Sequence, residues 1–343
     1  MAQVIQVRHD WSACAMVVIL CLMGKRNAHA LWHEHADSTV VRPETLDQRD
    51  GLTVLRASYS LISTGTERMV AAGQVPPQLH LDMEVPYMGG DLSLPVKYGY
   101  SLTGTMEQGP GTLWHVMHPH QDVCLVDPAD CFEVPPGIPA KRATLASNLE
   151  TALNALWDAM LLPGERVLIA GFGLIGSLVA RLASGIKGIE LLISEPNARR
   201  ARLCSEMGFQ LLPPEQTAVF PFDVAFHTSG TAAGLQQCLD LIGLEGRVVE
   251  LSWYGQRETT LQLGGDFHSL RKRLFSSQVS RIPPHMRARW TADRRKRKVF
   301  DLLADPEFDA HITHTVSLEE AAALFNNWRK SPPEGLGYCI QYE

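Results

Sequence analysis

The sequence of 343 residues predicts an α/β protein in which a doubly wound parallel sheet is joined to a β-rich domain. Three observations support this prediction. A glycine-rich turn separates an apolar strand from a helix-periodic segment within residues 166–182. Strands and helices then alternate over residues 189–279, which implies parallel strand order and right-handed crossovers. Short β-rich runs separated by many prolines and glycines occupy residues 30–105, as is typical of a compact β-barrel.

The glycine-rich turn follows an apolar run, Val167–Ala170, which is expected to be a strand buried on both faces. Its glycines fall at G-x-G-x-x-G spacing, where the first allows a tight turn and the second lets the backbone approach a diphosphate. The third lets the next helix pack closely on the strand. The start of that helix offers free N–H groups and a positive dipole to phosphates. We therefore predict a dinucleotide-binding site formed by Gly171, Phe172, Gly173, Leu174, Ile175 and Gly176.

The choice between the two nicotinamide dinucleotides depends on the end of the next strand, residues 189–193. Glu195 lies 19 residues after Gly176. An acid there can accept hydrogen bonds from both ribose hydroxyls of NAD and would repel the 2′-phosphate of NADP. Arg199 and Arg200 follow and could instead bind that phosphate, or lie in solvent on the first turn of the next helix. The sequence favours NAD and leaves NADP open.

Further cofactor contacts are expected where later strands end, because ligands of open α/β sheets bind at the carboxyl ends of the strands. A helix over residues 197–207 is followed by strands at Phe222–Phe226 and Gly246–Ser252, and the last strand of the sheet is expected at 274–279. The residues expected to line the cofactor site are Thr228, Ser229, Gly230, Ser252 and Trp253. Near the C-terminus, Ser317 and Glu320 predict a capping box for a helix over 318–328.

Composition limits the classes of partner. The net charge of −6 disfavours nucleic acid, and the basic run over residues 287–298 is interpreted as a solvated helix face. The seven cysteines are scattered without a C-x-x-C pair, which fits a reducing cytosol and a cytoplasmic protein. The apolar run 13–23 is too short to span a membrane, and its basic residues lie on the wrong side for a secretory signal. We therefore expect no membrane partner, and residues 1–27 to be an extension outside the fold.

From residue 30 onward, the chain resembles the medium-chain dehydrogenase/reductase superfamily, which includes zinc alcohol dehydrogenases and quinone reductases. Gly65-Thr66-Glu67 stands in place of the family's Cys-Gly-Thr-Asp loop, and Lys97-Tyr98-Gly99-Tyr100 through Gly104 in place of Gly-His-Glu-x-x-Gly. The segment Thr151–Leu156, the glycine turn and the strand Arg247–Ser252 extend the likeness. A branch with Ser-x-Gly-Thr-Glu and Pro-His-Gln-Asp motifs is the most similar, and bacteriochlorophyllide dehydrogenases are more distant.

The resemblance implies a GroES-like β-rich catalytic domain made of residues 28–150 plus 290–343, and a Rossmann domain over residues 151–289. It also implies that Thr151 contacts the cofactor, that the turn at Trp253 borders the nicotinamide, and that a homodimer forms through the edge strand of the Rossmann sheet.

The positions of the family's zinc ligands differ in this chain. Ser63-Thr64 takes the place of the first cysteine, Tyr100-Ser101 that of the His-Glu pair, and Ser147 that of the last cysteine. Neutral hydroxyls are poor zinc ligands, and the four-cysteine structural lobe is missing, so we predict no zinc. His118, His120 and Asp122 form a rival metal cluster, because residues two apart on a strand face the same side. Polar lining of a substrate mouth and structural histidines are the other interpretations of that cluster.

Without zinc, hydrogen-bond donors must polarise the carbonyl group of a substrate. Tyr100 and Thr66 are the predicted donors, because they lie in the loops that form the family's metal site, and the alternative for Tyr100 is a core position. Glu67 and either His118 or His120 are the predicted proton relays. The predicted function is a zinc-independent NAD(P)-dependent oxidoreductase acting on a small organic carbonyl, alcohol or activated alkene. The alternative is a non-catalytic nucleotide-binding sensor or structural protein.

Overall fold

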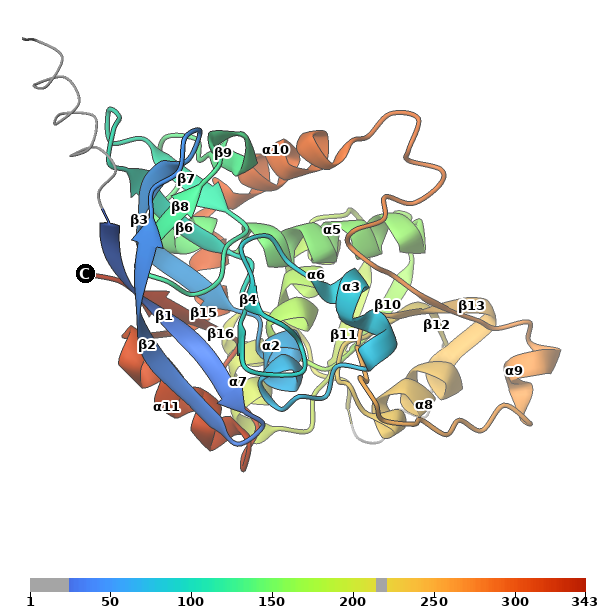
Figure 1. Ribbon diagram of the computed structural model, residues 1–343. Coiled ribbons are helices and arrows are strands. Elements are labelled where there is room, and N and C mark those ends of the chain that lie inside the picture. Colours follow the sequence, from blue (N-terminus) through green and yellow to red (C-terminus); the bar gives the residue numbers. More distant parts are fainter. Residues whose placement is uncertain (1–24, 214–220) are drawn as a thin grey trace, which may run out of the picture.

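The computed structural model describes residues 25–213 and 221–343. Strands within these residues form three sheets (Figure 1). Two of them, with strand orders β2-β1-β5-β4 and β15-β16-β3-β6-β7-β9, make up the β-rich part, and β8 pairs with β3 in the second. The third, β11-β10-β12-β13-β14, is entirely parallel. The predicted combination of a β-rich part with a doubly wound sheet is confirmed.

The four-stranded sheet is built on a long hairpin of β1 (Lys25–His35) and β2 (Ser38–Asp47), to which β5 (Val96–Lys97) and β4 (Gly89–Gly90) are added. The region predicted to be β-rich, residues 30–105, therefore opens with two paired strands. The first strand begins earlier than expected, because residues 25–27 pair with residues 45–47. These three residues belong to the fold, and their assignment to an extension was wrong. The rest of the predicted extension lies outside the described residues.

The larger β-rich sheet joins segments from both ends of the chain. It contains β3 (Thr53–Ile62), β6 (Leu102–Met106), β7 (Leu113–Val116), β8 (Val123–Val126), β9 (Cys131–Glu133), β15 (Ile312–Val316) and β16 (Gly337–Gln341). Strand β16 runs antiparallel to β3, which returns the C-terminus to this sheet (Figure 1). Strands β5 and β6 are close in the sequence but belong to different sheets. Gly99, with φ of +139°, lets the chain turn from one sheet to the other.

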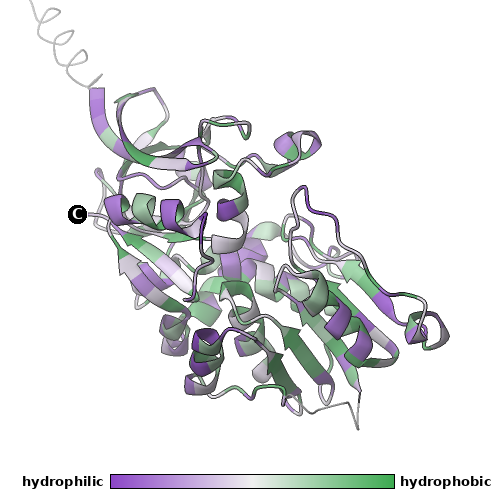
Figure 2. Ribbon diagram, turned by 90° about the horizontal axis from the view of Figure 1, so that it is seen from below, coloured by the Kyte–Doolittle hydropathy of each residue, from purple (hydrophilic) through white to green (hydrophobic). Residues whose placement is uncertain are grey.

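The parallel sheet contains β10 (Arg166–Ala170), β11 (Glu190–Ser194), β12 (Phe222–His227), β13 (Ile242–Glu250) and β14 (Arg273–Ser276). The helices between them are α6 (Leu174–Ser184), α7 (Ala198–Glu206), α8 (Ala232–Leu241) and α9 (Asp266–Ser269). Figure 2 shows mainly hydrophobic strands in this sheet, which fits burial on both faces. The predicted strands and helices are present here, with ends shifted by a few residues.

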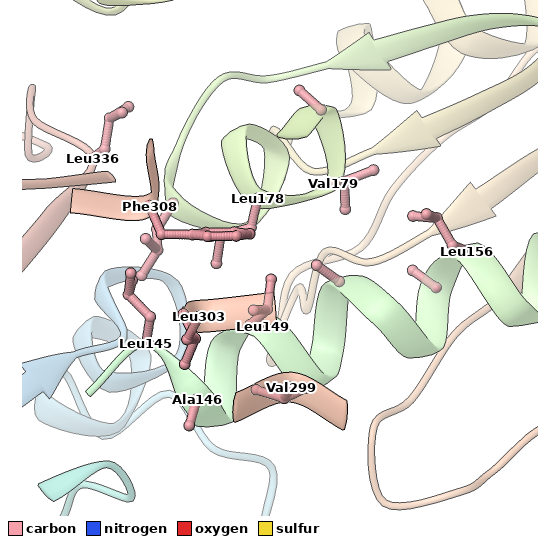
Figure 3. Packing of buried hydrophobic residues seen from close by; sticks show 14 of the residues in the cluster. Leu145, Ala146, Leu149, Leu156, Leu178, Val179, Val299, Leu303, Phe308 and Leu336 are labelled. Atoms are coloured by element: carbon pink, nitrogen blue, oxygen red, sulfur yellow. The ribbon is translucent and has the colours of Figure 1, made fainter. Parts of the chain in front are cut away.

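Helix α5 (Ala146–Ala159) lies in the middle of the molecule, between the β-rich part and the parallel sheet (Figure 1). Its buried Leu149 and Leu156 belong to one core cluster with Leu178 of α6 and with Val299 of α10 (Ala292–Leu303), as Figure 3 shows. Both parts of the molecule therefore share a core. The domain boundaries at 150/151 and 289/290 stay predictions.

Helix α10 corrects the interpretation of the basic run. Arg295 and Lys296 are buried rather than solvated, and both contact Glu150 of α5, at 3.2 and 2.5 Å. Two unpaired buried cations would be costly, and the shared carboxylate offsets their charge. Glu150 therefore holds α10 against α5. The other basic residues of this run are exposed, as predicted.

The remaining elements are α2 (Thr64–Ala71), η1 (Pro77–Leu79), α3 (His80–Met83), η2 (Pro128–Asp130), α4 (Ala140–Ala143), η3 (Pro306–His311) and α11 (Leu318–Trp328). The predicted capping box of α11 is confirmed, since the Glu320 N–H donates to Ser317 Oγ at 3.1 Å and the Ser317 N–H donates to Glu320 Oε2 at 2.7 Å. No helix within residues 25–213 and 221–343 is long and apolar enough to cross a membrane.

Candidate functional site

The glycine turn lies between β10 and α6, and two of its glycines are required by close backbone packing. Gly171 has φ of +102°, and a Cβ atom there would lie 2.8 Å from the backbone nitrogen of Ser229. A Cβ atom on Gly176 would lie 2.0 Å from the carbonyl oxygen of Gly171 and 2.7 Å from Thr228 Oγ1. A Cβ atom on Gly173 would meet nothing closer than Arg200, at 3.6 Å. The first and third glycines therefore pack the turn, and the second faces its open side.

The side chains of the other residues in this turn point into the core. Phe172 and Leu174 are buried in the central hydrophobic cluster, and Ile175 packs against it. Their side chains are therefore unavailable to a phosphate, and only backbone N–H groups other than that of Phe172, which donates to Glu195, could meet one. This is the contribution that a helix N-terminus makes to an anion site.

Glu195 makes contacts that its sequence position does not predict. Its Oε2 accepts from the Phe172 N–H and its Oε1 from the Asn197 N–H, both at 2.8 Å. Only 3% of its side chain is exposed, and Arg200 Nε lies 3.7 Å from its Oε2. The carboxylate therefore fastens the glycine turn to the start of α7, and its oxygens are already engaged with backbone donors.

Three arginines from different elements lie around the open side of the glycine turn. Arg200 belongs to the first turn of α7, Arg68 to α2, and Arg257 to the loop after β13, where it lies 3.9 Å from a Cβ atom built on Gly230. Burial, followed by the charges of Arg200 and Arg257, lowers the pKa of the Arg68 guanidinium. The Nε atoms of Arg68 and Arg200 have no hydrogen-bond partner among the described residues. This rim of positive charge suits a phosphorylated ligand.

A second group of predicted residues lies where α2 and α5 begin. Ser147 Oγ donates to the carbonyl oxygen of Tyr100 at 2.9 Å, and Asn148 Nδ2 donates to Ser63 Oγ at 3.2 Å. The structure thus brings together the positions at which the family's metal ligands are expected. Asn148 was not among the sequence-predicted residues, although it follows Ser147 directly. Its Oδ1 is buried and has no hydrogen-bond partner among the described residues.

The Tyr100 hydroxyl remains protonated around neutral pH. Burial, followed by the charge of Glu67, raises its pKa, and hydrogen bonding to Ser63 and Thr66 acts in the opposite direction. A phenol held in this form is a hydrogen-bond donor rather than a base. Tyr100 is half-buried rather than fully enclosed, and Thr66 is half-buried beside it. Both predicted donors therefore lie in one site.

A buried chain of hydrogen bonds runs away from this site. Glu67 Oε1 accepts from the Ser63 N–H, and Glu67 Oε2 lies 2.8 Å from His120 Nε2. His120 Nδ1 lies 2.7 Å from Ser60 Oγ, which in turn lies 2.7 Å from the Tyr342 hydroxyl. Glu67 and His120 are both fully buried. Their contact satisfies two groups that would otherwise be costly to bury.

His118 does not share these contacts. His118 and His120 lie in the connection between β7 and β8, so the prediction that both project from one strand was wrong. His118 stacks on Tyr87 with 5.1 Å between ring centres, and its Nδ1 lies 3.5 Å from Cys124 Sγ. Its burial is the main reason that its pKa is lowered to about 3. It is therefore a neutral core histidine.

In the part of the chain that the structure describes, no three His, Cys, Asp or Glu side chains are grouped so that they could hold a metal ion. The three members of the rival cluster, His118, His120 and Asp122, contact different partners. Asp122 binds the backbone and ring of His29 at 2.7 and 3.0 Å, whereas His120 binds Glu67.

The turns after β12 and β13 bring the predicted cofactor residues towards Tyr100. Thr228 Oγ1 donates to the carbonyl oxygen of Gly171 at 2.8 Å, and the Gly230 N–H donates to Ser252 Oγ at 2.9 Å. Trp253 packs on the same apolar cluster as Tyr100. Thr151 is half-buried in α5 and donates to Ser147 within its own helix at 3.3 Å. The two predicted regions of the site are thus adjacent.

Known proteins with similar sequences are dehydrogenases. The 2-dehydro-3-deoxy-L-galactonate 5-dehydrogenase of Pseudoalteromonas atlantica is 32% identical over 127 residues, which is 34% of this chain and 37% of the relative. The L-idonate 5-dehydrogenase of Escherichia coli is 27% identical over 139 residues, 38% of this chain and 40% of the relative. The match therefore spans about two fifths of the length of these two enzymes. No family model matches the chain.

A longer match is found with the 2-desacetyl-2-hydroxyethyl bacteriochlorophyllide A dehydrogenase of Rhodobacter capsulatus. It is 28% identical over 238 residues, 61% of this chain and 68% of the relative. Bacteriochlorophyllide dehydrogenases are the group that we expected from the sequence to be more distantly similar.

Similar solved structures cover nearly the whole chain. A proposed zinc-binding dehydrogenase of Sinorhizobium meliloti bound to NADP has a TM-score of 0.73 at 19% identity, covering 92% of this chain and 100% of that one. The L-idonate 5-dehydrogenase of E. coli has a TM-score of 0.73 at 15% identity, covering 93% and 99%. At such identities the likeness establishes the fold. Together with the sequence matches, it confirms the resemblance seen in the sequence.

Proposed function

We propose that the chain is an NAD(P)-dependent, zinc-independent oxidoreductase of the medium-chain dehydrogenase/reductase superfamily, which it resembles in sequence and in fold. Its substrate is a small organic carbonyl, alcohol or activated alkene. The observation that carries the proposal is the packing of the glycine turn on Thr228 and Ser229, next to a cluster of hydroxyl and amide groups around Tyr100. The nicotinamide, when bound, supplies or accepts the hydride.

Zinc independence is supported by the side chains at the expected metal position. The Ser63 hydroxyl accepts from Asn148, and the Ser147 hydroxyl donates to a backbone carbonyl. Ser101 Oγ donates to the carbonyl oxygen of Thr144 at 2.5 Å. Zinc prefers thiolate, imidazole and carboxylate ligands, and neutral hydroxyls already engaged with protein groups do not fit it.

Tyr100 and Asn148 provide the polar contacts that a redox-active oxygen needs. The protonated Tyr100 hydroxyl can donate to a carbonyl oxygen and stabilise the charge that develops there as hydride arrives. Asn148 Oδ1, which has no hydrogen-bond partner in residues 25–213 and 221–343, is proposed to accept from the hydroxyl of the corresponding alcohol. Both forms of the substrate thus find a hydrogen-bond partner in the same place.

Proton movement is proposed to follow the buried contacts of α2. Thr66 and Ser63 lie next to the Tyr100 hydroxyl, and Glu67 is linked through its Oε1 to the Ser63 N–H. The Glu67–His120 contact, at 2.8 Å, is the next step of this proposed route. We assign no relay role to His118, because its contacts lie elsewhere.

For the cofactor, we propose that NADP(H) is preferred over NAD(H). The sequence favours NAD because Glu195 ends the second strand of the sheet. In the structure, both oxygens of this carboxylate accept from backbone N–H groups, whereas Arg200 Nε, 3.7 Å from Glu195 Oε2, has no hydrogen-bond partner among the described residues. A 2′-phosphate can pair with Arg200, and the ribose hydroxyls of NAD would have to compete for Glu195.

The proposal is tested by comparing Tyr100→Phe with Tyr98→Phe. Loss of the Tyr100 hydroxyl removes a donor to the substrate oxygen, so kcat is expected to fall about a hundredfold with cofactor binding unchanged. The Tyr98 hydroxyl donates to the carbonyl oxygen of Met83 at 3.1 Å, and its loss is expected to leave kcat within about threefold. The assay uses NADPH and a panel of carbonyls, enones and quinones.

Equal activity of the two variants would contradict the role of Tyr100. A wild-type protein that binds NADPH but turns over none of the panel would favour the alternative, a non-catalytic nucleotide-binding protein. A cytoplasmic location and a homodimer formed through the edge strand β14 are further parts of the proposal, and light scattering of the purified protein tests the dimer.

A further inference from the structure

Glu250 is the last residue of β13, and its carboxylate is a meeting point for several groups. Both of its oxygens lie 2.8 Å from His227 Nδ1. Its Oε1 also accepts from the Ser252 N–H at 2.7 Å, and its Oε2 accepts from the Tyr254 hydroxyl at 3.1 Å. Only 13% of this side chain is exposed, and His227 is fully buried. No part of the proposed chemistry uses either residue.

The chain of contacts continues from His227 into the next turn. His227 Nε2 lies 2.7 Å from Ser229 Oγ, which lies 2.9 Å from Thr231 Oγ1. Thr231 Oγ1 accepts from the Gly234 N–H and caps α8. With a proton on His227 Nδ1, every hydroxyl in this chain both donates and accepts, and the last donor reaches the carboxylate of Glu250.

The order serine, histidine and acid is also that of a nucleophile with its base and orienting group. Packing argues against this chemistry. A Cβ atom built on Gly234 would lie 2.3 Å from Ser229 Oγ and 3.1 Å from His227 Nε2. Both atoms thus lie beneath the first turn of α8, where the backbone of Gly234 covers them. A hydroxyl in that place has no room for an acyl group.

The position of this series of hydrogen bonds indicates its structural role. Its serine end holds the turn Thr228–Gly230, on which Gly171 and Gly176 pack. Its Glu250 end holds the loop at Ser252. Ser252 Oγ also links this loop directly to the turn by accepting from the Gly230 N–H. Two turns that follow neighbouring strands are thereby fixed relative to each other at the carboxyl edge of the sheet, where ligands bind.

We propose that Glu250 and His227 are positioning residues for the nicotinamide half of the cofactor. They fix the loop at Ser252 and Trp253 against the turn Thr228–Gly230. The adenosine half is held separately, by the glycine turn and Arg200. This inference rests on the proposed function, because it requires that the chain binds a nicotinamide dinucleotide.

The test compares Glu250→Gln with Glu165→Gln by calorimetry of the full-length protein. Glutamine keeps one oxygen acceptor and replaces the other carboxylate oxygen by an NH2 donor. All three partners of Glu250 are donors, so at least one of them loses its acceptor. We expect the dissociation constant for NADPH to rise about tenfold, while that for 2′,5′-ADP, which lacks the nicotinamide half, changes less than about twofold. A uniformly destabilised domain would not separate the two ligands in this way.

Glu165 is a matched control, because it lies at the amino ends of the strands of the same sheet, directly before β10. Its side chain is 16% exposed, and its carboxylate accepts from Arg247 at 2.8 Å. Glu165→Gln is expected to lower the melting temperature without changing either dissociation constant. Should Glu250→Gln fail to fold, Tyr254→Phe removes a single partner of the carboxylate and is expected to weaken NADPH binding by a smaller factor.

Unchanged NADPH binding in the folded Glu250 or Tyr254 variant would overturn the inference and leave the proposed function intact. An equal loss of NADPH and 2′,5′-ADP binding would also overturn it, because the effect would then reach the whole site. A wild-type protein that binds neither ligand would overturn both proposals.

Discussion

Glu195 and Arg200 are the two side chains on which the proposed cofactor choice depends. Sequence spacing places an acid at the end of the second strand, where it would favour NAD. The side chain instead turns inward, and its oxygens accept from the N–H groups of Phe172 and Asn197. Arg200 lies beside it with 24% of its side chain exposed. The cation rather than the anion is then available to a ligand.

Replacing Arg200 by alanine tests this proposed choice. Loss of a charge-assisted contact to the 2′-phosphate is expected to raise the dissociation constant for NADPH about tenfold and to leave that for NADH within about twofold. Arg199 is a control of the same type on the same helix turn, because it is exposed and pairs with Glu334 at 3.0 Å. Arg199→Ala should change neither constant. Tighter binding of NADH than of NADPH by the wild-type protein would contradict the proposed preference.

At the scale of the element, the turn between β10 and α6 depends on a helix packed closely on its own strand. Gly176→Ala would place a methyl group 2.0 Å from the carbonyl oxygen of Gly171. Because backbone cannot rotate away as a side chain can, we expect a loss of about 2 kcal/mol in the free energy of unfolding and NADPH binding weakened at least about tenfold. Urea denaturation and calorimetry measure the two effects.

Gly185, at the other end of α6, provides the control for this substitution. A Cβ atom there meets only the carbonyl oxygen of Leu182, at an ordinary 3.5 Å. Gly185→Ala is therefore expected to keep both cofactor binding and stability, with a gain of a few tenths of a kcal/mol from the less flexible unfolded chain. A Gly176→Ala protein that behaved in the same way would show that the turn can shift without cost.

Elements whose signals are local were predictable from the sequence. The glycine turn and the capping box of α11 are each specified within a dozen residues, and both are present. Contacts between distant segments were not predictable. The Glu150 contacts with Arg295 and Lys296 join residues that are far apart in the chain. The inward turn of Glu195 and the separate surroundings of His118 and His120 likewise depend on tertiary packing, which hydrophobic periodicity does not encode.

At the scale of the whole molecule, buried neutral histidines connect stability to pH. His33 in β1, His118 after β7 and His311 at the end of η3 are each buried, and burial is the main reason that the pKa of each is lowered to about 3. Nearby cations add to the effect, Arg329 at His33, Lys97 at His118 and Arg181 at His311. These histidines come from segments that span most of the described chain, so their effects act on the whole fold.

The direction of the pH dependence follows from proton counting. Below the unfolded-state pKa of about 6.5, the unfolded chain binds protons that the folded protein does not, so stability falls as the pH falls from about 6.5 towards 3. At pH 5.5 each histidine should cost about 1.4 kcal/mol relative to pH 8. Urea denaturation at a series of pH values measures how the free energy of unfolding changes with pH.

The Ser177→Ala/His311→Leu variant removes both members of a 2.9 Å contact. Its unfolding should take up one proton fewer, so its free energy of unfolding should depend less steeply on pH. The exposed His268, changed to Asn, should leave this dependence unchanged. A constant free energy of unfolding between pH 8 and 5 would mean that these histidines are protonated within the fold, and the cores around β1, β7 and η3 would then have to admit charge.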